Sequence, residues 1–142
     1  MSTPRTNEYA VVIEQIEPGE FEARLPDLPD ALAFGATPEE ALAQAQQALD
    51  ALFDVCWADS EPFPDPVATP APGRALRLSL DRAARLALAR EMERRSLSKV
   101  AVAAAAGVDE KVVRRVLSGR AARLEQTLRL LDSLGARPLF AA

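Results

Sequence analysis

Residues 98–119 read SKVAVAAAAGVDEKVVRRVLSG, and this stretch decides the fold of the second half of the chain. It predicts a short helix that ends before Gly107 and a second helix that opens at Asp109. A helix-turn-helix needs a small residue where its helices touch, which Ala103 supplies, and a residue tolerant of positive φ in the turn, which Gly107 supplies. The apolar residues expected to lock the second helix are Val102, Ala106, Val108, Val113 and Val116. The sequence therefore predicts a helix-turn-helix.

The second helix of this motif is predicted to carry a DNA-binding face. With Val113 and Val116 turned inward, its basic side chains point outward, where Arg and Lys pair with guanine O6 and N7 in a major groove. Acidic residues at its start can accept from cytosine, and Arg120 in the next loop suits phosphates. DNA is favoured over RNA because no aromatic stacking platform accompanies the arginines. The candidate DNA-binding residues are Asp109, Glu110, Lys111, Arg114, Arg115, Ser118 and Arg120. The alternative is a solvated helical bundle with exposed arginines.

The formal net charge of −4 conceals opposite charges in the two halves of the 142-residue chain. Residues 1–74 hold fourteen acidic and three basic residues, a net charge of −11, and residues 75–142 hold seven acidic and fourteen basic residues, a net charge of +7. A basic half attracts nucleic acid and an acidic half repels it. Five prolines between residues 60 and 73 favour an extended linker. We expect a β-α domain at 1–61, a Pro-rich linker at 62–74 and a helical DNA-binding and oligomerisation domain at 75–142.

The first sixty residues predict a three-stranded sheet covered by one helix. A β-forming segment at 8–16, a Pro-Gly turn and an alternating segment at 21–25 together predict a β-hairpin. Residues 26–30 contain two prolines and are predicted to form a rigid loop before a short edge strand at 31–35. Thr37 is expected to cap a helix that runs to about residue 57. The expected fold class is α+β, a ββ-β-α unit followed by an all-α domain. Residues 75–80 again alternate between apolar and polar side chains, which allows a further strand. The sequence does not identify the sheet that this strand would join.

Histidine is absent, and Cys56 is the single cysteine. An intramolecular disulfide is therefore excluded, and a zinc site or a histidine acid/base has no usual supplier. The chain has no run of about 18 apolar residues and no basic N-terminus followed by an apolar stretch, so neither a membrane span nor a signal peptide is predicted. We expect a cytoplasmic protein without cofactors. One enzymatic alternative is a Mg²⁺-dependent nuclease built from carboxylates alone.

Motifs in both halves carry a family resemblance. The first half contains Tyr9-Ala10-Val11-Val12-Ile13, then Gly19-Glu20-Phe21 with Leu25-Pro26-Asp27-Leu28-Pro29, then Gly35-Ala36-Thr37-Pro38-Glu39-Glu40-Ala41. In this order the motifs resemble the HicB antitoxins. The Pro-rich stretch at 62–66 fits that family too, and residues 107–117 resemble its helix-turn-helix form. Many relatives have a glycine where this chain has Asp30, which allows a different local loop geometry.

The resemblance implies a partial RNase H-like fold in the first half, without nuclease activity. It also implies a partner, a HicA-like ribonuclease toxin that cleaves mRNA, and repression of the shared operon by the second half. A ribonuclease that grips RNA presents a basic surface, which a domain at −11 is suited to occupy. The candidate toxin-binding residues lie around the hairpin and the Pro-rich loop and are Glu20, Glu22, Asp27 and Asp30. The alternative is that these acids form a solvated face.

The sequence is therefore interpreted as an antitoxin and DNA-binding autorepressor that catalyses no reaction. A homodimer or a higher homo-oligomer is expected, because helix-turn-helix proteins usually bind paired half-sites. The alternative from a different class is a stand-alone, ligand-sensing helix-turn-helix repressor, in which the β-α unit would hold a small molecule.

Overall fold

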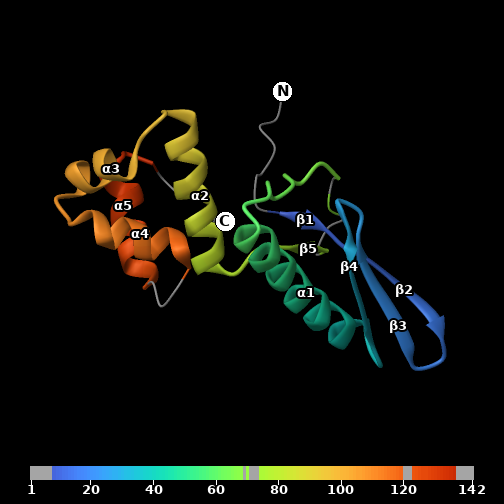
Figure 1. The fold of residues 1–142 in the computed structure, drawn as a ribbon. Helices are drawn as coiled ribbons and strands as arrows, with labels where there is room; N and C mark the ends of the chain where they lie inside the picture. Colours follow the sequence, from blue (N-terminus) through green and yellow to red (C-terminus); the bar gives the residue numbers. More distant parts are fainter. Residues whose placement is uncertain (1–7, 69, 71–73, 120–122, 137–142) are drawn as a thin grey trace. The chain divides into compact units, whose positions relative to one another are not determined.

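The computed structural model describes residues 8–68, 70, 74–119 and 123–136. The chain divides into two compact units, Met1–Leu78 and Ser79–Ala142 (Figure 1). Within the described residues, the first unit holds all the strands and one helix, and the second unit holds four helices. The predicted α+β class is confirmed.

A three-stranded antiparallel sheet in the order β2-β3-β4 forms the centre of the first unit. Its strands are β2 (Val12–Glu17), β3 (Glu20–Leu25) and β4 (Leu28–Gly35). The predicted hairpin is confirmed, and its turn uses Gly19 at a φ of +76°. The third strand differs from the prediction: it begins at Leu28, which pairs with Leu25, so residues 28–30 belong to the strand and not to a rigid loop. Pro29 is tolerated because β4 is an edge strand of this sheet.

One helix, α1 (Pro38–Ala58), covers one face of this sheet (Figure 1). Thr37 caps it as predicted, because its hydroxyl accepts a hydrogen bond from the backbone N–H of Glu40 at 3.1 Å. The Glu40 carboxylate in turn accepts from the backbone N–H of Ala36 at 3.3 Å. The side chains that α1 buries are Ala41, Ala45, Leu49 and Phe53, and those that the strands bury are Ala23, Leu25, Leu28, Ala31 and Ala33.

Two short strands close the first unit across a long stretch of sequence. Strand β1 (Tyr9–Ala10) pairs antiparallel with β5 (Ala75–Leu76). The single strand expected at 8–16 is therefore split at Val11 into β1 and β2. Because β5 pairs with β1, the boundary between the two units lies after Leu78, and the expected start of the second domain at residue 75 differs from it by four residues.

The described start of the Pro-rich segment packs on the first unit through Phe63 and Pro64. Phe63 is only 8% exposed, and its ring meets those of Tyr9 and Phe53 edge-on at centroid distances of 5.8 and 5.2 Å. The Tyr9 hydroxyl donates a hydrogen bond to the carbonyl oxygen of Pro64 at 2.6 Å. The segment expected to act as a spacer at 62–74 thus begins as part of a folded unit.

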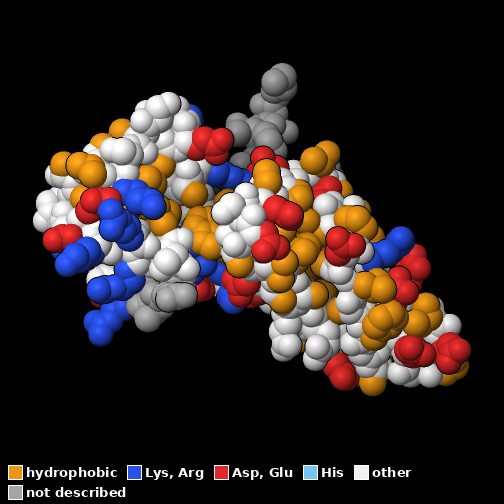
Figure 2. Space-filling view, in the orientation of Figure 1, with side chains coloured by type: hydrophobic (Ala, Val, Ile, Leu, Met, Phe, Trp, Pro, Cys, Tyr) orange, Lys and Arg blue, Asp and Glu red, His pale blue; other side chains and the backbone are white. Residues whose placement is uncertain are grey.

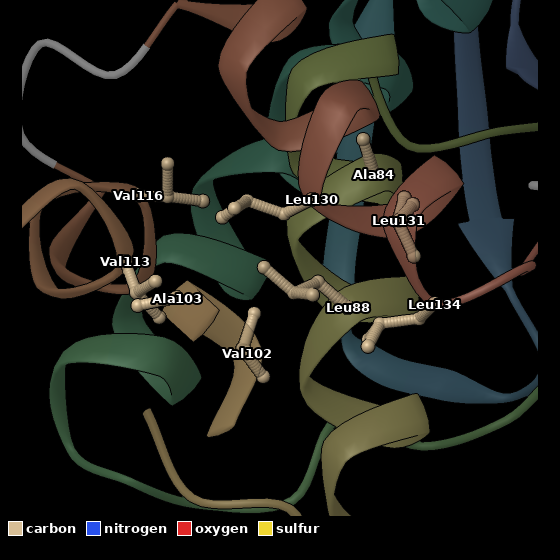
Figure 3. Packing of buried hydrophobic residues seen from close by; sticks show 9 residues of the cluster. All are labelled: Ala84, Leu88, Val102, Ala103, Val113, Val116, Leu130, Leu131 and Leu134. Atoms are coloured by element: carbon tan, nitrogen blue, oxygen red, sulfur yellow. The ribbon is translucent and has the colours of Figure 1, made fainter. Parts of the chain in front are cut away.

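The second unit is a small helical bundle. Its helices are α2 (Leu80–Arg94), α3 (Lys99–Ala106), α4 (Glu110–Ser118) and α5 (Leu124–Ser133). All four contribute to one apolar core, which Figure 3 shows from close by; its buried members are Ala84, Leu88, Val102, Ala103, Val113, Val116, Leu130, Leu131 and Leu134. The short helix predicted to end before Gly107 and the helix predicted to open at Asp109 are confirmed as α3 and α4.

Candidate functional site

Helices α3 and α4 are joined by a three-residue turn whose ends are fixed by local hydrogen bonds. Gly107 ends α3 in the left-handed region, with a φ of +67°. The backbone N–H of Val108 then donates to the carbonyl oxygen of Ala103 at 3.0 Å, which closes the end of the helix. Asp109 caps α4, because its carboxylate accepts from the backbone N–H of Lys111 at 2.8 Å. The turn therefore fixes the direction in which α4 leaves α3.

Two valines set the rotation of α4 about its own axis. Val113 and Val116 are both fully buried and point into the core that α3 supplies with Val102 and Ala103 (Figure 3). Residues three apart share one face of a helix. The face of α4 opposite the valines is consequently solvent-exposed, and its exposed members are Lys111, Arg114, Arg115 and Ser118.

The basic side chains of this face differ in how they are held. Arg114 forms an ion pair with Glu110, one turn earlier, with 2.9 Å between Nη2 and Oε1. Within the part of the chain that the structure describes, Lys111 and Arg115 have no such partner. Lys and Arg side chains gather over the region of α4 in Figure 2. The face can therefore present cations to an anionic ligand.

The structure brings six of the seven predicted DNA-binding residues onto α4 or its N-cap, and Arg120 lies outside the described residues. Not all six are equally available. The Asp109 carboxylate is used in capping, the Glu110 carboxylate holds Arg114, and the Ser118 hydroxyl donates to the carbonyl oxygen of Arg115 at 2.8 Å. The exposed cations are thus the part of this set that is best placed for an external ligand.

One residue behind α4 was missed by the sequence interpretation. Arg85 of α2 is 8% exposed, and its guanidinium lies against Gly119, the residue that ends α4. Arg85 follows Ala84 and lies three positions before Leu88, and both of these side chains are fully buried. This helical spacing is the sequence signal for an inward-facing arginine. Arg85 is placed to hold the end of α4, not to contact a ligand.

The acidic candidates of the first unit do not form one cluster. Glu20 begins β3, whereas Asp27 follows its other end, and six residues of strand span about 20 Å. Asp27 is also engaged within the chain, because its carboxylate accepts from the backbone N–H groups of Val67 at 3.0 Å and Ala68 at 3.1 Å. Glu22 lies on β3 and Asp30 on β4, where Asp30 is exposed.

The described residues hold no group of three or more Cys, Asp or Glu side chains placed to bind a metal ion. Among the same residues, no helix combines the length and apolar composition that a membrane span requires. Cys56 lies on α1, where burial and the charges of Glu61 and Asp59 raise the pKa of its thiol. The thiolate form is therefore disfavoured there.

Comparison with known proteins identifies two relatives. The chain is 43% identical over 61 residues to Antitoxin HicB 1 of Photorhabdus laumondii, an alignment that covers 42% of this chain and 39% of that protein. It is 31% identical over 129 residues to Antitoxin HicB 2 of the same organism, which covers 89% of this chain and 90% of the relative. No family model matches the chain. The second alignment spans both structural units, so the likeness extends to the helical bundle as well as to the sheet.

Proposed function

Because the chain belongs to the HicB family of antitoxins, we propose that it binds and neutralises a HicA-like ribonuclease toxin that cleaves mRNA, and that it represses its own operon by binding operator DNA. In this proposal the protein is a regulator without catalytic activity. The first unit is its toxin-binding domain, with a partial RNase H-like fold. The second unit is its helix-turn-helix DNA-binding domain, formed by α3, the turn at Gly107 and α4.

The charge of the first unit supports the assignment of the toxin to that unit. Residues 1–74, which make up the first unit except for its last four residues, carry a net charge of −11. A protein that cleaves RNA needs a basic surface for phosphates, so an acidic domain both attracts it and competes for that surface. The toxin is also expected to stabilise the first unit by mass action, because it binds the folded form.

The observation that carries the DNA-binding proposal is the exposed basic face of α4. Buried Val113 and Val116 fix the rotation of the helix, so Lys111 and Arg115 must face away from the bundle. A helix about 10–12 Å in diameter fits the major groove, where Arg and Lys pair with guanine. A homodimer or a higher homo-oligomer would present two such helices to paired half-sites on the operator.

Co-expression with the small open reading frame adjacent to this gene tests the antitoxin proposal. The neighbour alone should arrest growth, and the full chain should restore it. Growth arrest that persists in the presence of folded chain would contradict neutralisation. A chain that represses its promoter but never binds the neighbour would favour the ligand-sensing repressor.

Two single-arginine variants test the DNA proposal under matched conditions. Arg115→Ala and Arg129→Ala remove the same charge from exposed positions, the first on α4 and the second on α5. With duplex DNA from upstream of the operon, Arg115→Ala should weaken binding about tenfold or more, since one bidentate base contact contributes about 1–3 kcal/mol. Arg129→Ala should change binding much less. Equal losses in both variants would indicate non-specific charge attraction and refute the assigned face.

A further inference from the structure

The face of the sheet that points away from α1 carries a second candidate binding surface, which we call the outer sheet face. Cross-strand partners point to the same side of a sheet. Ala23 pairs with Ala33, and both are buried, so this row faces α1. The neighbouring rows point the other way, and the outer sheet face is made of Val12, Arg24 and Leu32 in one row and Glu14, Glu22 and Phe34 in the next.

Large apolar side chains on this face remain uncovered. Leu32 is 48% exposed and Phe34 is 46% exposed. An antiparallel sheet with one solvated face normally places polar residues there, as β2 and β3 do with Glu14, Glu22 and Arg24. Leu32 and Phe34 break this rule on β4, one of the two edge strands of the sheet. An exposed edge with apolar side chains favours association with another chain.

The charge of the outer sheet face favours a basic partner over a second copy of this chain. Arg24 is paired with Glu14, with 3.3 Å between Nη2 and Oε1, while Glu22 stands directly opposite Phe34 on the same face. The hairpin end of the sheet adds Glu17 and Glu20. In Figure 2, hydrophobic and acidic side chains lie next to one another over the region of these strands. A second copy of the face would bring carboxylates against carboxylates, whereas a basic partner would neutralise them.

We propose that the outer sheet face is the surface through which the first unit binds its basic ribonuclease partner. This inference rests on the proposed function and gives it a site. Phe34 and Leu32 pack against apolar residues of the partner, because exposed aromatic side chains are the usual energetic centres of interfaces. Glu22 and the hairpin acids Glu17 and Glu20 pair with the basic side chains that otherwise hold RNA. Of the acids singled out from the sequence, Glu20 and Glu22 belong to this surface, whereas Asp27 is engaged within the chain.

A pair of apolar-to-acid substitutions in the full chain tests the surface. Phe34→Glu places a carboxylate on the outer sheet face, and Val55→Glu makes a similar change at a position that is 56% exposed on α1. The measurement is inhibition of RNA cleavage by the purified ribonuclease encoded beside the gene. We expect Phe34→Glu to raise the half-inhibitory concentration about thirtyfold or more, the loss typical of a central interface residue, and Val55→Glu to change it about threefold or less.

Controls distinguish a damaged binding surface from misfolding and from a surface that binds a second copy of this chain. Each variant is first required to keep the wild-type thermal transition of Trp57 fluorescence, since Trp57 reports on the first unit. Glu22→Lys, which leaves the side chains of Leu32 and Phe34 in place, should weaken inhibition as well and slow association. If the wild type inhibits and Phe34→Glu inhibits equally, the surface is wrong while the proposed function stands. If the wild type does not inhibit, both the proposed surface and the proposed function are wrong. A wild-type dimer that Phe34→Glu converts to monomers without loss of inhibition would assign the face to a second copy and overturn the inference.

Discussion

The guanidinium of Arg85 occupies the space that a side chain at Gly119 would need. A Cβ added at Gly119 would lie 3.0 Å from Nη1 and 3.2 Å from Cζ of Arg85. Gly119 ends α4 at a φ of +74°, and Arg85 comes from the middle of α2. A cation at the C-terminal end of a helix interacts favourably with the helix dipole. The contact therefore joins α2 to the last turn of the helix that carries the candidate DNA-binding side chains.

Substitution of Gly119 is expected to destabilise the second unit more than substitution of Gly107. Both glycines have positive φ, so alanine costs about 1 kcal/mol of backbone strain at either position. Only Gly119→Ala also displaces Arg85, because nothing lies within 4 Å of a Cβ at Gly107. We expect a total loss of about 1–2 kcal/mol for Gly119→Ala, because the guanidinium end of Arg85 has to shift away from the added methyl group.

Urea unfolding followed by far-UV circular dichroism measures this difference. Helices of both units contribute to that signal, whereas Trp57 is the single tryptophan and lies in the first unit. The transition of Trp57 fluorescence should therefore keep its wild-type midpoint in both variants. Equal losses for Gly107→Ala and Gly119→Ala would show that the Arg85 contact contributes nothing.

Gly35 makes a different kind of contact, and Gly35→Ala is expected to destabilise the first unit. A Cβ there would lie 2.4 Å from the backbone nitrogen of Ala41 and 2.8 Å from the backbone carbon of Glu40. These atoms belong to the first turn of α1 and cannot move without shifting the helix off the sheet. We expect a loss of about 3 kcal/mol or more in the free energy of unfolding.

Gly19→Ala is the matched control for Gly35→Ala. Gly19 has a φ of +76°, and nothing lies within 4 Å of an added Cβ, so only backbone strain of about 1 kcal/mol is expected. Denaturant unfolding followed by Trp57 fluorescence compares the two. A loss at Gly35 no larger than that at Gly19 would contradict the close approach of α1 to the end of β4.

The elements predicted correctly from the sequence depend on signals that are local in the chain. Thr37 caps α1 through a residue only three positions away, and Gly107 ends α3 through its own φ. The buried and exposed faces of α4 follow from helical periodicity alone, which is why its exposed cations were predictable. Such features need no knowledge of the rest of the fold.

The features that were missed depend on residues far apart in sequence. Ala75 and Leu76 pair with β1, more than sixty residues earlier, and nothing in their own alternation identifies that partner. The Asp27 carboxylate reaches backbone groups forty positions later, so its spacing from Glu20 and Glu22 suggested a cluster that the length of β3 does not permit. The exposure of Leu32 and Phe34 depends on the register of β3 and β4, which determines the rows of side chains that α1 covers.

The bonds from Asp27 to the Pro-rich segment predict a change in protease sensitivity. Asp27→Ala removes the acceptor for the backbone N–H groups of Val67 and Ala68. Hydrogen bonds to a charged group contribute about 1.5–3 kcal/mol, so the segment should detach from the first unit more often. Elastase, which cleaves after small apolar residues, should cut at Val67 or Ala68 about tenfold faster than in the wild type if about 1.4 kcal/mol is lost.

Asp30→Ala is the control for this experiment, because Asp30 is an exposed acid on β4 three residues away. Mass spectrometry of the fragments should show unchanged cleavage at Val67 and Ala68 in that variant. Asp27→Ala should also retain inhibition of the ribonuclease, since its carboxylate is engaged within the chain. Loss of inhibition without increased cleavage would show that Asp27 contributes to the surface that binds the ribonuclease.

The ion pairs of Glu91 predict how the stability of the second unit depends on pH. A hydrogen bond from Arg94, together with the charges of Arg94 and Arg95, lowers the pKa of the Glu91 carboxyl below its usual value of 4.5. A carboxyl whose pKa is lowered by folding stabilises the folded state above its unfolded pKa and loses that contribution as the pH falls through its folded pKa.

The variant Glu91→Gln tests this dependence, because it lacks the charge at every pH. The free energies of unfolding of wild type and variant should therefore differ most at about pH 6–7 and converge as the pH drops below 4.5. Because Arg94 is largely exposed, about 0.5 M NaCl should shrink the difference at neutral pH by screening. Chemical denaturation followed by circular dichroism measures the free energies of unfolding of wild type and variant. A difference that stays constant from neutral to acidic pH would show that Glu91 acts by packing alone.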